Sequence, residues 1–271
     1  MRETLEVKFG LLLTISTPLK PGSVNRISLD SEFESRLLEA VSLFEFIDKA
    51  YMRGRELAEG RVTAQKLGLG GLLALALRTA IQLTGLRPIL GLTVASITLS
   101  TLKGVLDQEG RGLREGLRQA ILTVLYRSSP EDSLKLIEGL EATGLSRALA
   151  HLENRGVTRS RVALEALALG HLYEVLSEVD TGFMLNIRDL GRLLELSNRI
   201  RGEKSVVRAV AEAYKELAFE RKLVSIEDLS IRSLEDFLRI DRKLRARRED
   251  LDSLLGGVYI AATLALVERW P

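Results

Sequence analysis

Apolar residues recur along most of the chain at the three- and four-residue spacing of a buried helix face. The segment from Thr158 to Glu178 shows this pattern clearly. Its candidate inner face carries Val162, Leu164, Ala168, Leu169, Leu172 and Leu176. Such spacing forms one apolar stripe on a helix with about 3.6 residues per turn. Alternating β-branched runs and Asn-Gly turns, which would indicate strands, are lacking. The pattern therefore predicts an all-α fold.

Start and stop residues divide the pattern into successive helices. Ser31 with Glu34 forms a capping box, and Ser129 precedes a proline at the first position of another helix. The expected helices are Glu3–Ser16, Ser31–Ala58, Thr63–Thr84, Pro88–Lys103, Leu113–Tyr126, a helix from Ser129, Thr158–Glu178, Asp189–Arg201, Lys204–Lys222, Ile226–Leu229, Ser233–Arg248 and Leu251–Trp270. No low-complexity linker or repeat of roughly 20–50 residues separates them. We therefore expect one compact multi-helix domain over residues 1–271.

Composition narrows the chemistry that this domain can carry. Of the 271 residues, 46% are hydrophobic and 28% are charged, which is typical of a soluble globular protein with a sizeable core. The 39 basic and 37 acidic side chains nearly balance, so a general nucleic-acid binder is disfavoured. Cysteine is absent, which excludes disulfides, a thiol nucleophile and thiolate metal sites. The two histidines, His151 and His171, argue against a multi-histidine metal centre, and we expect His171 to be a partly buried packing residue.

The longest uncharged runs are Pro88–Leu102 and Ser253–Val267. Each has 15 residues, fewer than the roughly 18–20 that a membrane span needs, so we expect two buried core helices. The acidic N-terminus does not resemble a signal peptide. These features predict a cytoplasmic protein without a membrane partner. Asn and Gln are scarce, with four of each, while Arg and Glu are abundant, a pattern typical of a thermophile.

The loop Thr17–Asp30 is the most unusual segment. Its prolines, Pro18 and Pro21, stiffen the backbone, and its donors are Lys20, Ser23, Asn25 and Arg26. A pre-organised loop rich in donors suits a phosphate or polyphosphate. The alternative is an ordinary connector with solvated charges.

The same segment carries a family resemblance. A helix with Leu11-Leu12-Leu13 that leads into Ser16-Thr17, Lys20-Pro21-Gly22, Val24 and Arg26 resembles the triphosphoribosyl-dephospho-CoA synthase family, and its archaeal branch most of all. That family has a Lys-Pro-Gly-Asn/Leu-Val signature after its first helix. Less specific similarities follow in the same order over most of the chain: Gly71-Leu72-Leu73 with Ala76, Ser129–Asp132 with Leu136, Glu153–Thr158, Glu178–Phe183 and Ala261–Leu266.

The resemblance implies an all-α fold and a nucleotide reaction. Known members move the ribose C1′ of ATP to a hydroxyl of dephospho-CoA, releasing adenine and keeping the triphosphate. ATP, as substrate, and Mg²⁺ are the implied cofactors, a dephospho-CoA-like molecule is the implied partner, and a homo-oligomer is left open. The implied catalytic residues are Asp180 and Asp250. The candidates for nucleotide binding are Lys20, Gly22, Ser23, Asn25, Arg26, Thr93, Ser96, Lys103 and Arg188, and those for the metal are Glu45, Asp48 and Asp180.

The chain departs from the family at two places. The family motif Asn-Thr-(Asn/His)-Leu-Gly aligns either with Leu92–Ser96, where Leu92 and Val94 replace polar side chains, or with Ser100–Gly104. A Gly-Ser/Thr-x-Ala-Asp stretch before the last helix is replaced by Arg247–Ser253, in which Asp250 or Asp252 could supply the carboxylate. A catalytically degenerate binding or scaffold protein of the same fold is therefore the alternative function.

Two charged groups have alternative interpretations. Glu45 and Asp48, three residues apart on a helix, could bind a divalent ion, but exposed surface charge is the commoner explanation. The basic run from Arg239 to Arg248 could contact CoA phosphates or RNA. Because acidic residues interrupt and flank it, a solvated helix face with ion pairs is the default interpretation.

Overall fold

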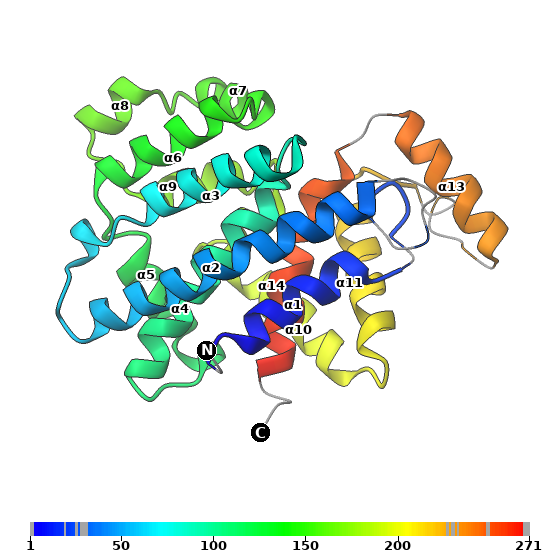
Figure 1. Cartoon of the computed structure of the whole chain (residues 1–271), viewed down its shortest axis with the longest axis horizontal. Coiled ribbons are helices and arrows are strands. Elements are labelled where there is room, and N and C mark those ends of the chain that lie inside the picture. Colours follow the sequence, from blue (N-terminus) through cyan, green and yellow to red (C-terminus); the bar gives the residue numbers. More distant parts are fainter. Residues whose placement is uncertain are drawn as a thin grey trace.

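A computed structural model of the chain confirms the all-α prediction. It describes residues 3–18, 20–24, 27, 32–225, 228, 231, 233–247 and 250–267. Every regular element within these residues is a helix, and no strand occurs among them. The helices share one hydrophobic core (Figure 1), so the described residues form a single multi-helix domain.

Two helices, α4 (Leu90–Gln108) and α14 (Leu255–Val267), form the centre of the fold. Both are apolar on all sides because other helices surround them. The long helix α2 (Glu32–Ala58) packs along α4, and α1 (Leu5–Ser16) packs on α14. Glycine permits the close approach of α2 to α4, because a Cβ on Gly54 would overlap the carbonyl of Thr101.

The remaining helices cover this centre from two sides. On one side α3 (Leu69–Thr84) packs against α6 (Pro130–Ala142), and the neighbouring helices are α5 (Leu113–Val124), α7 (Ser146–Asn154), α8 (Arg159–Leu164) and α9 (Leu169–Leu176). On the other side lie α10 (Leu190–Gly202), α11 (Val206–Glu220) and, at the far edge in Figure 1, α13 (Leu234–Ala246). Short 3-10 turns are η1 (Ala64–Lys66), η2 (Thr181–Met184) and η3 (Leu251–Leu254).

The prediction of one continuous helix from Thr158 to Glu178 is wrong. The chain forms α8 and α9 instead, with a turn between them in which Ala166 has a φ of 51°. This turn lets the amide of Leu169 donate to Ser128 Oγ (2.9 Å), which starts α9 against the end of α5. Most of the predicted inner face is buried in α8 and α9, but Leu164 at the end of α8 is 86% exposed, so its assignment to the inner face is wrong. The helix expected from Thr63 to Thr84 is also interrupted. Gly68 has a φ of 68° and lies between η1 and α3.

Other helix boundaries also differ from the prediction. Helix α7 was not predicted, and α4 continues beyond Lys103 to Gln108. The last predicted helix begins as η3 before α14, and residues 268–271 lie outside the described part. The predicted helix Ile226–Leu229 also lies outside it, apart from Asp228.

Two helical segments are long and apolar enough to cross a membrane by length and composition alone, Ala64–Thr84 and Leu90–Gln108. A bent pair, Leu234–Ala246 with Leu251–Val267, would add a third. The apolar stretch of Leu90–Gln108 is 94% buried inside the fold, and α14 is buried as well. Burial by protein therefore accounts for the apolar character of the two runs singled out from the sequence.

Candidate functional site

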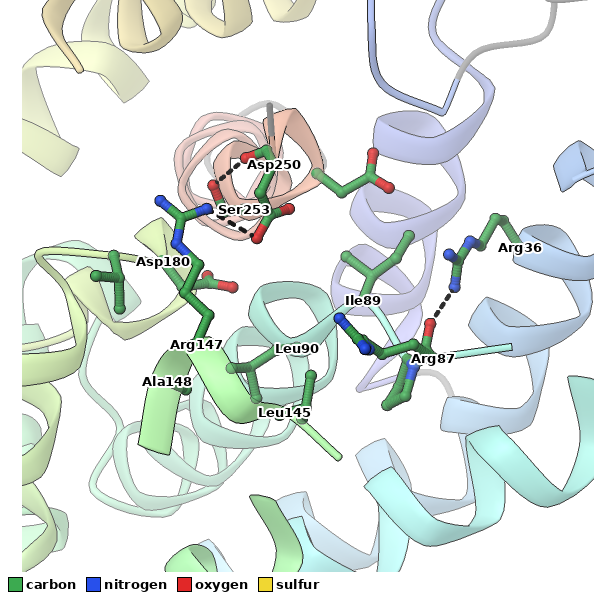
Figure 2. A pocket seen from close by; sticks show the side chains of 13 residues that line it. Arg36, Arg87, Ile89, Leu90, Leu145, Arg147, Ala148, Asp180, Asp250 and Ser253 are labelled. Atoms are coloured by element: carbon green, nitrogen blue, oxygen red, sulfur yellow. Dashed lines mark hydrogen bonds and ion pairs between the residues drawn. The ribbon is translucent and has the colours of Figure 1, made fainter. Parts of the chain in front are cut away.

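The described residues enclose a cavity of about 160 Å³ at a point where five segments meet (Figure 2). The segments are the start of α2, the approach to α4, the start of α7, the residues before η2, and η3. The cavity is lined by Arg36, Arg87, Pro88, Ile89, Leu90, Leu145, Arg147, Ala148, Val179, Asp180, Asp250, Asp252 and Ser253. These residues are far apart in the sequence, so packing of the helices creates the cavity.

Three glycines bring the backbones below the cavity into contact. A Cβ on Gly182 would overlap Gly91 Cα, and a Cβ on Gly256 would overlap Gly182 Cα. Any side chain at these positions would separate η2 from the first turns of α4 and α14. A Cβ on Gly91 would overlap the carboxylate of Asp180, so this close approach also fixes Asp180 against the start of α4.

Asp180 is the buried acid of the cavity. Its Oδ1 accepts a hydrogen bond from the amide of Gly182 (2.8 Å), and the side chain is 7% exposed. Among the described residues no lysine or arginine forms an ion pair with it. Burial raises the pKa of Asp180 to about 8, and the nearby charge of Asp250 adds to the rise, although the Gly182 amide opposes it. At neutral pH this carboxyl is therefore largely protonated.

Asp250 and Asp252 lie on the η3 side of the cavity and have different partners. Asp250 Oδ2 pairs with Arg147 Nη1 at 3.2 Å, and both side chains are half-exposed. Burial, together with the charge of Asp252, raises the pKa of Asp250. Asp252 Oδ1 accepts hydrogen bonds from Ser23 Oγ (2.6 Å) and from the amide of Val24 (3.1 Å). The turn that carries the family signature thus holds Asp252 in place.

Two arginines face the acids across the cavity. Arg36 is buried, donates to the Arg87 carbonyl (2.6 Å) and pairs with Glu39 (2.9 Å), but its Nε is buried without a hydrogen-bond partner. The exposed side chain of Arg87 has no hydrogen bond or ion pair to any described residue. Figure 2 shows the guanidinium of Arg87 and the carboxylate of Asp180 turned toward the centre of the cavity from opposite walls.

This donor set fits a phosphorylated ligand. Guanidinium groups bind phosphate oxygens through paired hydrogen bonds, and Mg²⁺ is usually held by one or two carboxylates together with ligand phosphates. The described residues contain no group of three or more His, Asp or Glu arranged to hold a metal by themselves. Asp250, and Asp180 when ionised, could each give one oxygen to a cation shared with the ligand. The cavity volume suits the phosphate end of such a ligand, with the remainder outside.

The predicted phosphate loop is not part of the cavity wall. Lys20 is fully buried, and its Nζ donates to the carbonyls of Thr14 and Ile15, where it closes the end of α1. Burial lowers the pKa of Lys20 to about 7. The amide of Gly22 donates to Asp241 (2.7 Å), and Ser23 binds Asp252. Lys20, Gly22 and Ser23 therefore have partners within the protein and do not line the cavity, and Asn25 and Arg26 lie outside the described residues.

The candidates on α4 also lie away from the cavity. Thr93 and Ser96 are buried in the core, where Ser96 Oγ donates to the Thr93 carbonyl (3.1 Å). Lys103 pairs with Asp107 (2.7 Å) near the opposite end of the helix. None of these three residues lines the cavity, so the structure gives no support to their prediction as nucleotide-binding residues. Leu92 and Val94 are buried too, and they do not fill the cavity.

The predicted second cation and the predicted metal pair have other partners. Arg188 donates to the Glu174 carbonyl (2.7 Å) and pairs with Glu178, outside the cavity. Glu45 forms an exposed surface pair with Lys49 (2.5 Å), whereas Asp48 is partly buried, pairs with Lys8 (2.7 Å) and accepts a hydrogen bond from Thr4 Oγ1 (2.6 Å). The structure therefore does not support Arg188, Glu45 or Asp48 as ligand-binding residues.

Two expectations about other charged side chains have different outcomes. The basic run on α13 forms ion pairs with acidic neighbours, for example between Arg245 and Asp241 (2.9 Å) and between Lys243 and Asp228 (2.6 Å). The basic side chains are ion-paired, as the sequence favoured, but the carboxylates of Asp228 and Asp241 are buried rather than solvated. His171, however, is exposed rather than partly buried, with its ring at the edge of Tyr126.

The cavity thus joins three acids named from the sequence, Asp180, Asp250 and the alternative Asp252, with three arginines that the sequence did not single out. Arg87 directly precedes the proline at the start of a predicted helix, and this was its only signal. Arg36 and Arg147 resemble ordinary surface charges, and Arg147 belongs to the helix that was not predicted. Comparisons of the chain with protein-family models, with curated proteins and with solved structures find no match.

Proposed function

We propose that this protein is a nucleotide-dependent transferase whose reaction resembles that of triphosphoribosyl-dephospho-CoA synthases. The observation that carries the proposal is the pairing of an uncompensated buried acid, Asp180, with the unpartnered guanidinium of Arg87 across one cavity. Asp180 is buried with one backbone donor and no cation, whereas Arg87 is exposed and makes no bond to a described residue that a ligand would have to replace. A phosphorylated ligand with a divalent cation would satisfy both.

Four of the residues that line the cavity have a role in this proposal. Arg87 and Arg36 bind the phosphate groups of the nucleotide, and Asp250 holds the Mg²⁺. The ion, when bound, neutralises the phosphates and favours the ionised form of Asp180. Asp180 then accepts the proton of the attacking hydroxyl as that oxygen bonds to the ribose C1′ and the bond from C1′ to adenine breaks. The proton returns to the departing adenine. A pKa near 8 suits a group that must gain and lose a proton at neutral pH.

The proposal is tested by incubating the protein with ATP, Mg²⁺ and dephospho-CoA and measuring released adenine by chromatography. We expect adenine release by the wild type and a loss of about 100-fold or more in Asp180→Asn, because a positioned base typically contributes that much. Glu45→Gln is the matched control, since it also neutralises a carboxylate but lies outside the cavity, and its rate should equal that of the wild type. Absence of adenine release by the wild type would refute the transferase, and equal release by Asp180→Asn would refute the role of Asp180 as the base.

One observation favours a second candidate, a binding or scaffold protein of the same fold. The signature residues Lys20, Gly22 and Ser23 all serve packing and hydrogen bonding inside the structure. A relative could therefore keep the signature to maintain the fold alone. This candidate predicts that ATP with Mg²⁺ raises the melting temperature by mass action while no adenine appears.

A further inference from the structure

A second, smaller cavity of about 60 Å³ adjoins the first. The two cavities share four lining residues: Arg147, Val179, Asp180 and Ser253. The second cavity is otherwise lined by Glu178, Thr181, Arg221, Leu223 and Leu254. Asp180 and Arg147 therefore line both cavities, and a ligand in either cavity can contact the carboxyl group of Asp180.

Arg221, which follows α11, supplies a positive charge to this second cavity. Its Nη1 donates to the main-chain carbonyl of Glu178 (3.1 Å), and no carboxylate among the described residues forms an ion pair with it. A guanidinium that binds only a neutral carbonyl retains most of its capacity to bind an anion, because its other N–H groups have no partner there. In this respect Arg221 matches Arg87 of the first cavity.

The carboxylate of Glu178, which lines the second cavity together with Arg221, already has ion-pair partners. It pairs with Arg155, with Arg188 (3.5 Å) and with the ring of His151 (3.1 Å). Although burial opposes it, the hydrogen bonds from Arg155 and His151 hold the pKa of Glu178 below its usual range. Because Asp250 pairs with Arg147 and Glu178 pairs with Arg155, the charge of Arg221 has no carboxylate partner among the described residues of this cavity.

We propose that Arg221 and Arg147 form a second anion site, which binds a phosphate group of a second ligand on the opposite side of Asp180 from Arg87. The volume matches a single phosphate group, and Leu223 with Leu254 provides an apolar wall for the adjoining carbon atoms of a phosphate ester. The site itself does not depend on the proposed function. Only the identification of its ligand as the acceptor substrate rests on that function. Two phosphorylated ligands would then meet at Asp180.

The site is tested by equilibrium dialysis with radiolabelled pyrophosphate, without nucleotide or turnover. The wild type should bind two pyrophosphates per chain, and Arg221→Gln should bind one with the remaining affinity unchanged. Arg221→Lys keeps the charge and should retain both sites, which separates loss of the site from loss of the fold. Arg161→Gln, which removes one positive charge on α8 outside both cavities, should also bind two.

A wild type that binds a single pyrophosphate would overturn the proposal, as would an Arg221→Gln variant that binds as many as the wild type. Loss of binding by Arg161→Gln would also overturn it, since the effect would then be one of overall charge. The outcome is independent of the transferase. If the wild type binds two pyrophosphates but releases no adenine, only the proposed reaction is rejected. If it releases adenine but binds a single pyrophosphate, only the second anion site is rejected.

Discussion

The signature turn around Lys20–Ser23 and the cavity around Asp180 both contain buried polar groups, but the two regions satisfy them differently. In the turn, the Lys20 ammonium has two carbonyl acceptors, and Ser23 has a carboxylate acceptor. In the cavity, Asp180 has one backbone donor and no cation, while Arg87 has no partner among the described residues. Groups that the fold satisfies internally explain stability, and groups that it leaves unsatisfied at a cavity indicate a ligand.

The largest expected effect concerns the glycines that support the cavity. Gly182→Ala should lower the free energy of unfolding by about 3 kcal/mol or more, because its Cβ would overlap the backbone of Gly91. Gly71→Ala, in open space on α3, should raise it by about 0.5–1 kcal/mol through helix propensity. Urea unfolding of both variants measures the difference, and similar effects of the two would show that the close approach does not support the cavity.

The next effect is the pH dependence of the free energy of unfolding that arises from Asp180 in the cavity. Since the folded state binds the Asp180 proton more tightly than the unfolded state does, the stability from this group is complete below about pH 4 and is lost as pH rises through about 8. Asp180→Asn removes this loss. We therefore expect the free energy of unfolding of the variant, minus that of the wild type, to rise by about 2–5 kcal/mol between pH 5 and pH 9, as measured by urea unfolding. A difference that does not change with pH would contradict the account.

A smaller effect is expected in the turn. Ser23→Ala removes the shorter of the two hydrogen bonds to Asp252 and leaves a partly buried carboxylate less satisfied, which should lower the free energy of unfolding by about 1–3 kcal/mol. Ser42→Ala removes a hydroxyl that donates only to the Glu39 carbonyl of its own helix, and should cost about 0.5 kcal/mol or less. If the two variants were equally stable, the turn would not hold Asp252 in place.

The smallest effect on stability is expected for Arg87→Gln. Its guanidinium has no partner among the described residues, so the free energy of unfolding should change by about 0.5 kcal/mol or less. Thermal unfolding without ligand tests this directly. A large loss would mean that Arg87 has a structural role and would remove the contrast between the cavity and the turn.

Much of the fold could be predicted from the sequence, because helix periodicity and caps act locally. Ser129, which accepts a hydrogen bond from the amide of Asp132, caps α6 as expected. The turn at Ala166 could not be predicted, since its positive φ is imposed by the contact between α9 and the end of α5. An alanine gives no local signal for such a turn.

The candidate site could be predicted only in part. Asp180 and Asp250 were chosen by resemblance, whereas the raised pKa of Asp180 depends on burial that arises when η2, α4 and α14 meet at glycines. The partners of the signature lysine could not be predicted, because a stiff, donor-rich loop is equally suited to bind phosphate or to cap a helix end. Only the packed structure shows that Lys20 donates to α1.

The most direct test is the affinity for ATP with Mg²⁺, measured by isothermal titration calorimetry at pH 7 on the wild type, Arg87→Gln and Arg188→Gln. The two variants lose the same charge, but only Arg87 lines the cavity. A lost charged hydrogen bond of about 1.5–3 kcal/mol should weaken binding by Arg87→Gln by about 10- to 100-fold, and Arg188→Gln should bind as the wild type does. Equal affinities of the wild type and Arg87→Gln would contradict the assignment of the cavity as the nucleotide site.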